Sequence, residues 1–172
     1  MDQSTFSTDE SSNDDFCNSI LSRFGNSPNE SHQQLCATIG SMSQLLKDQN
    51  QPFTPTAYFC ATCSSLDRIS KERNPNYHLI DALLTILSLV IVRVNAAVLK
   101  KQREFVSELV ARVIVSPSIS ESSVINGLKC VSHLLIIRDS VHWSDVYLLF
   151  NVLLGFLTDS RPKVIIILNI NF

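Results

Sequence analysis

One stretch of the chain, residues 144–164, constrains the fold more than any other. It reads SDVYLLFNVLLGFLTDSRPKV, an apolar helix followed by a polar turn and the start of a second helix. Apolar residues recur every three or four positions, and others widen that face, so the helix needs neighbours on more than one side. Asp159 and Ser160 can accept hydrogen bonds from free amides at a helix start, and Pro162 fits a first helical turn. The stretch therefore predicts a joint between two helices of a stacked repeat.

The composition favours an all-α fold with no strong charge. Of 172 residues, 45% are hydrophobic and 17% charged, and the six prolines separate apolar segments instead of interrupting them. Residues 1–30 hold six acidic residues against one basic residue, a net charge of -5. The remainder holds 13 basic and 10 acidic residues, a net charge of +3. This balance is too weak to argue for nucleic-acid binding by electrostatics alone.

The amino-terminal segment and the apolar runs do not indicate secretion or membrane insertion. Residues 1–15 are acidic and rich in serine, which predicts a disordered leader and excludes a signal peptide. The longest apolar run, residues 82–92, would span only ~16 Å as a helix, against a hydrocarbon core of ~30 Å. Five cysteines in a chain without a secretory signal indicate free thiols in a reducing compartment.

Apolar residues at helical spacing predict six helices before the one in residues 144–164. We expect them over residues 16–24, 31–47, 54–69, 74–90, 96–115 and 118–138. The starts are indicated by Ser31 with Gln34, by Thr54 with Pro55, by Asn74 with Pro75, and by Ser118 with Glu121. The helix over residues 74–90 is apolar on nearly every side and should be central. In the next helix, Glu108 and Arg112 have the spacing of a favourable ion pair.

The helix starts also have a regular spacing. Starts near residues 54, 96 and 144 are separated by 42 and 48 residues, and each interval contains two helices. That is the spacing of HEAT or armadillo repeats. We therefore predict a right-handed α-solenoid of HEAT/armadillo-like helical hairpins over residues 16–164, preceded by the leader and followed by an aberrant apolar tail, residues 165–172.

Several segments resemble one family of repeat proteins. They are LSRFGNS, DQNQPFTPTAYFCATCSSLDR, IDALLTILSLV, AVLKKQRE, GLKCVSHLLIIRD and LLGFLTDSRPKV. Together, over roughly residues 15–164, they resemble the amino-terminal region of the plant ribosomal RNA processing protein twelve-like family, whose members are much longer. The resemblance implies a nucleolar HEAT/armadillo-repeat scaffold without catalysis or cofactors. It also implies nuclear association with pre-ribosomal particle proteins and with rRNA, in rRNA processing and in subunit maturation and export.

The chain departs from the repeat pattern after Val164, where it reads IIILNINF. These residue types have codons rich in A and T, which suggests the hypothesis that translation has run past a splice junction and produced a truncated form. Genomic DNA in which codon 165 begins a normal exon would contradict this. We expect self-association through Val146, Leu149, Phe150, Leu153 and the tail, because a repeat stack without a polar cap exposes its last helix.

The residues with potential chemistry are few. Cys60 and Cys63 form a C-x-x-C motif, which leaves a thiol-redox or metal-binding protein as the alternative function. The motif lies inside a predicted helix and has no second C-x-x-C, which favours two packed cysteines and no metal site. The candidate contacts to RNA or a partner are Lys100, Lys101, Arg103, Arg161 and Lys163. A solvated outer face is the alternative interpretation for these basic residues.

Overall fold

The computed structural model describes residues 15–137, 143–157, 160–161 and 164; the leader and the tail lie outside this part of the chain. The side chains of residues 15 and 143–146 are likewise not described. The helices are α1 (Asp15–Phe24), α2 (Glu30–Asp48), α3 (Pro55–Ser70), α4 (Tyr77–Val90), the 3-10 helix η2 (Ile91–Arg93), α5 (Ala96–Ile114), α6 (Glu121–Ile136) and α7 (Trp143–Phe156). No strand occurs in this described part, and none of its helices has the length and apolarity needed to cross a membrane.

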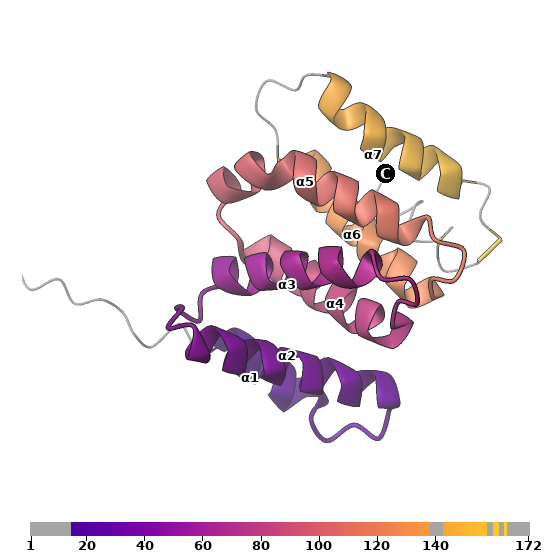
Figure 1. Ribbon diagram of the computed structural model, residues 1–172. Helices are drawn as coiled ribbons and strands as arrows, with labels where there is room; N and C mark the ends of the chain where they lie inside the picture. The colour runs from indigo at the N-terminus through magenta and orange to yellow at the C-terminus, as the bar shows by residue number, and fades with distance from the viewer. Residues whose placement is uncertain (1–14, 138–142, 158–159, 162–163, 165–172) are drawn as a thin grey trace, which may run out of the picture.

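The helices form two layers of stacked hairpins (Figure 1). Each of the pairs α1–α2, α3–α4 and α5–α6 packs together as a hairpin. Along the stack, α3 packs on α5 and α5 on α7, while α2 packs on α4 and α4 on α6. We call α3, α5 and α7 the first layer, and α2, α4 and α6 the second layer. The first-layer helices α3, α5 and α7 begin at residues 55, 96 and 143, which confirms the predicted repeat of helical hairpins.

Helix α4 is central, as its sequence predicts. It packs against α2, α3 and α6. Six of its apolar side chains are at most 2% exposed: Ile80, Leu83, Leu84, Ile86, Leu87 and Val90. A helix that is apolar on nearly every side can only be stable with neighbours on several sides, and the stack supplies them.

The caps at the helix starts agree with the sequence in one case and differ in three. The side chain of Thr54 accepts a hydrogen bond from the amide of Ala57 at 3.2 Å, as expected for an N-cap before a proline. The other predicted caps are wrong by two residues. Asn29, Asn76 and Ser120 cap α2, α4 and α6, where Ser31, Asn74 and Ser118 were expected. Polar residues cluster at each start, and only the backbone geometry decides which side chain reaches a free amide.

Two helices approach each other very closely at Gly127. This glycine is buried in α6, and a Cβ atom there would overlap the Cγ2 atom of Ile114 at the end of α5. By contrast, a Cβ atom at Gly40 in α2 would meet no heavy atom within 4 Å. The α5–α6 hairpin therefore needs glycine at position 127 for steric reasons.

Helix α7 divides its apolar residues between two faces. The first face is buried in the stack and comprises Leu149, Val152, Leu153 and Phe156, each at most 9% exposed. The prediction that Leu149 and Leu153 mediate self-association is therefore wrong, because both side chains belong to the core that α7 shares with the rest of the chain. Phe150 is 52% exposed and stays available. The Val146 side chain and residues 165–172 lie outside the described residues.

Candidate functional site

The cysteines of the C-x-x-C motif do not form a reactive pair. Cys60 is exposed and Cys63 is 3% exposed, one turn further along α3, and both thiols are free. Burial, with a smaller contribution from Cys60, raises the pKa of Cys63 to about 12. Burial also raises the pKa of the fully buried Cys130. A redox or metal-binding thiol needs a lowered pKa and access, so this geometry favours packed cysteines. Across the described residues, no group of three His, Cys, Asp or Glu side chains is placed to hold a metal ion.

The basic residues that the sequence proposes for RNA or partner contact do not form one patch. Lys100 and Lys101 are exposed on the first turns of α5. Arg103 is half-buried, and its Nε atom is buried without a hydrogen-bond partner, so part of this side chain packs in the stack. Arg161 lies near the opposite end of α5, and Lys163 lies outside the described residues. Lys100 and Lys101 precede the end of α5 by more than three turns, so the two groups are separated by roughly 20 Å along this helix.

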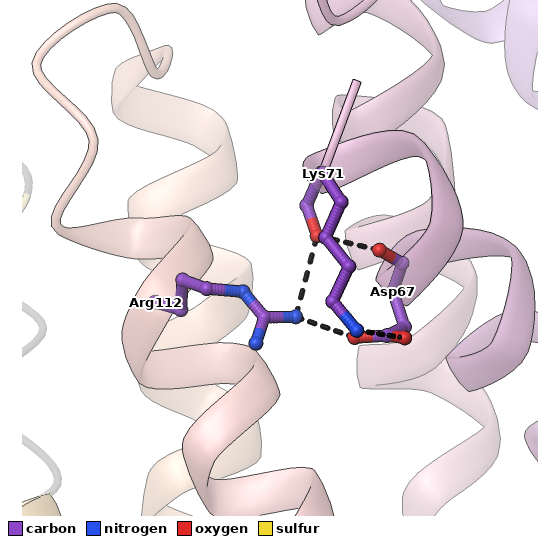
Figure 2. Close-up of polar contacts among 4 residues, drawn as sticks. Asp67, Lys71 and Arg112 are labelled. Carbon is purple, nitrogen blue, oxygen red and sulfur yellow. Dashed lines mark hydrogen bonds and ion pairs between the residues drawn. The ribbon is translucent and has the colours of Figure 1, made fainter. Parts of the chain in front are cut away.

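An ionic cluster joins two first-layer helices (Figure 2). Asp67 of α3 accepts hydrogen bonds from Lys71 Nζ at 2.7 Å and from Arg112 Nη2 of α5 at 2.5 Å. Arg112 also lies 3.4 Å from Ser70 Oγ. The hydrogen bond from Lys71, followed by that from Arg112, lowers the pKa of the Asp67 carboxyl group. Arg112 is therefore engaged in joining neighbouring repeats.

A groove runs across all three second-layer helices. It has a volume of about 440 Å³ and lies over the first turns of α2 and α4 and the start of α6. His32 lines this groove and is held in place by two contacts. Its Nδ1 atom lies 2.7 Å from Ser27 Oγ, and the centre of its ring lies 4.7 Å from the centre of the Phe24 ring. The residues that line this second-layer groove are Phe24, Glu30, Ser31, His32, Gln34, Leu35, Asn76, His78, Asp81, Ala82, Thr85 and Ser122.

The floor of the second-layer groove is held by a hydrogen-bond network between α4 and α6. Asp81 Oδ1 accepts from the hydroxyl groups of Ser122 and Ser123, both at 2.7 Å, and from Ser120 at 3.3 Å. Three donors fix the orientation of this carboxylate. The described lining includes two carboxylates, two histidines and several hydroxyl and amide groups, and none of these lining residues is Lys or Arg. The groove therefore suits a segment rich in hydrogen-bonding or cationic groups better than a phosphate.

No pattern in the sequence indicates this groove. In the sequence, Asp81 stands out only as the charged residue that precedes an apolar run. Its serine partners follow 39 to 42 residues later. Only the packing of α4 against α6 brings them together.

A second groove, of about 870 Å³, lies in the first layer between α7 and the end of α5. Arg161 borders it, about 6.0 Å from the ring of Phe156. Its other walls are mainly apolar and include Ile114, Pro117, Leu148 and Val152. This first-layer groove shows that α7 covers the carboxyl-terminal end of α5 incompletely.

Comparison with known proteins relates most of the chain to one family. The family model described as RRP12-like, N-terminal HEAT repeats, matches residues 2–165. An RRP12-like protein of Gallus gallus is 28% identical over 150 residues. These residues cover 85% of this chain and 11% of the Gallus gallus protein, so the chain corresponds to a small part of that relative. No solved structure matches the chain.

Proposed function

Because the chain belongs to the RRP12-like family and corresponds to its N-terminal HEAT repeats, we propose that it is a non-catalytic helical-repeat scaffold in ribosome biogenesis. The observation that carries this proposal is the family match over residues 2–165. The proposed roles are pre-rRNA processing and the maturation and nuclear export of ribosomal subunits. The proposed location is the nucleus and the nucleolus. The proposed partners are proteins of the pre-ribosomal particle, with rRNA as the alternative.

We place the partner site on the second-layer groove. Stacked repeats bind through extended surfaces contributed by several repeats, and this groove crosses α2, α4 and α6. The network around Asp81 holds its floor in one geometry, which reduces the ordering cost of binding.

The chemistry of the groove favours a protein partner over RNA. RNA phosphates are contacted mainly by Lys and Arg, and neither occurs among the described residues that line the groove. Carboxylates such as Glu30 and Asp81 repel phosphate and attract the cationic side chains of a protein. Lys100, Lys101 and Arg161 remain the candidates for RNA contact, at two separate places on the stack.

Co-purification tests the proposal. A tagged full chain expressed in cells is expected to localise to the nucleus and to sediment with pre-ribosomal particles, and its direct protein partners should remain bound after ribonuclease treatment. A chain that stays in the cytosol and sediments free of these particles would contradict the ribosomal role. Complete release by ribonuclease would show that RNA, not protein, is the partner.

A matched pair of variants tests the position of the site. His78→Arg places a bulky charged side chain in the second-layer groove, and Ser64→Arg adds the same charge to an exposed position of α3. We expect His78→Arg to weaken partner binding and Ser64→Arg to leave it unchanged. Equal binding by both variants, with particle association intact, would place the site elsewhere on the stack.

A further inference from the structure

The outer face of α7 carries the largest concentration of exposed apolar side chains in the described part of the chain. Five of the twelve large apolar residues that are exposed there lie within residues 147–157, while no other α-helix contributes more than one. Tyr147, Phe150, Leu154 and Leu157 are between 45% and 67% exposed. We call these four residues the α7 stripe. Single exposed apolar residues are ordinary, but a cluster of this size indicates an interaction surface.

The spacing of the α7 stripe is that of a helix-pairing seam. Its members follow one another at intervals of three, four and three residues, which are the a and d positions of two successive heptads. The stripe also continues an existing interface, because α5 already packs on α3 and α7 on α5, and α7 is the last helix of this series that the structure describes (Figure 1). The shape that fits it is therefore another helix with the same seam.

The charges around the stripe permit pairing with an identical helix. Residues 147–157 read YLLFNVLLGFL and contain no charged side chain. Two copies of a charged seam would repel each other, whereas two copies of this one would not. We propose that the α7 stripe is a homotypic interface, through which a second copy of this chain packs antiparallel about a two-fold axis. The axis passes between Phe150 and Leu154, so that Phe150 of one chain faces the partner's Leu154.

The area of the stripe makes this a small interface. Four large side chains that are about half exposed offer roughly 400 Å² per chain. The total of roughly 800 Å² is below the ~1,200–2,000 Å² of stable complexes. The dimer is therefore reversible and depends on the concentration of the chain.

Sedimentation of the full chain over a wide range of concentrations tests this inference. The wild type is expected to shift reversibly from monomer to dimer. Leu154→Glu is expected to raise the Kd about a hundredfold or more, because a buried, unpaired carboxylate is strongly disfavoured. Leu45→Glu is the matched control, since Leu45 is 44% exposed on α2 and Leu154 is 45% exposed. It should dimerise like the wild type, and circular dichroism should show that both variants are folded.

A mixing experiment tests the geometry. Phe150→Glu and Leu154→Lys chains should each be mainly monomeric alone and should pair with each other when mixed, because one of the two contacts then becomes an ion pair. A wild type that is monomeric at every concentration would overturn the proposal. It would also be overturned if Leu154→Glu and Leu45→Glu had equal effects. Association that survives Leu154→Glu but disappears on removal of residues 165–172 would assign the contact to the tail and reject the stripe.

Discussion

Replacing Gly127 by alanine tests the packing of the α5–α6 hairpin directly. In an open helix position, alanine is more stable than glycine by about 0.5–1 kcal/mol, because glycine loses more backbone entropy on folding. At position 127, however, the new methyl group would overlap the Cγ2 atom of Ile114, a branched core side chain that is 1% exposed. Overpacking of this kind costs about 1–3 kcal/mol.

The steric cost exceeds the gain in helix propensity at this position. We expect Gly127→Ala to lower the free energy of unfolding by about 1 kcal/mol, the difference between the central values of the two effects. Gly40→Ala is the control, because its methyl group would point into open space. This variant should raise the free energy of unfolding by about 0.5–1 kcal/mol.

A double-mutant cycle identifies the clash as the cause. Ile114→Ala removes the obstructing Cγ2 atom and should itself cost about 2–5 kcal/mol, as a buried truncation. In that background, Gly127→Ala should become neutral or stabilising, which gives a coupling free energy between the two sites. Urea unfolding of the four chains of the cycle and of Gly40→Ala, monitored by circular dichroism, measures these free energies. If Gly127→Ala stabilises the wild-type chain as much as Gly40→Ala does, the close approach of α5 and α6 is refuted.

Three further outcomes are expected. In the native chain, a thiol reagent should modify Cys60 readily and Cys63 only after unfolding, since Cys63 is buried and its pKa is about 12; equal rates would contradict the packing of α3. Asp67→Asn should cost less than about 1 kcal/mol at neutral pH, because the ion pairs are at the surface. The pKa of Asp67 is lowered in the folded chain, so its contribution is present above the unfolded pKa and is lost as the pH falls through the folded pKa; the stability difference between the two chains should shrink in acid. Asn76→Ala should lower the free energy of unfolding in urea by about 1 kcal/mol through loss of the α4 cap, while Asn74→Ala should have little effect. A larger loss from Asn74→Ala than from Asn76→Ala would show that Asn74 is the cap, as the sequence suggested.

The local features of the chain could be predicted because they depend on neighbouring residues. Apolar spacing of three and four residues predicted the helices, and Thr54 before Pro55 predicted the start of α3 within one residue. The apolar side chains on nearly every side of residues 79–90 predicted that α4 would be central. The regular spacing of the hairpins and the segment resemblance then led to the correct family.

The contacts between helices could not be predicted in the same way. The sequence spacing favours a pair between Glu108 and Arg112, but in the folded chain Arg112 donates to Asp67, which is 45 residues away. The sequence also identifies α7 as apolar on most of its surface without showing that Leu149 is buried and that Phe150 is exposed.

The sequence by itself therefore determined the helices, their approximate ends and their arrangement as stacked hairpins. Helix formation and amphipathic spacing act over a few residues, and a repeated spacing fixes which helices are paired. Only the tertiary structure decided the second-layer groove, the Asp81 network, the close approach at Gly127 and the exposed α7 stripe. These features depend on the rotation of each helix about its axis and on the side chains of its neighbours in the stack. Both are set by packing between residues that lie about 40 positions apart, as Asp81 and Ser122 do.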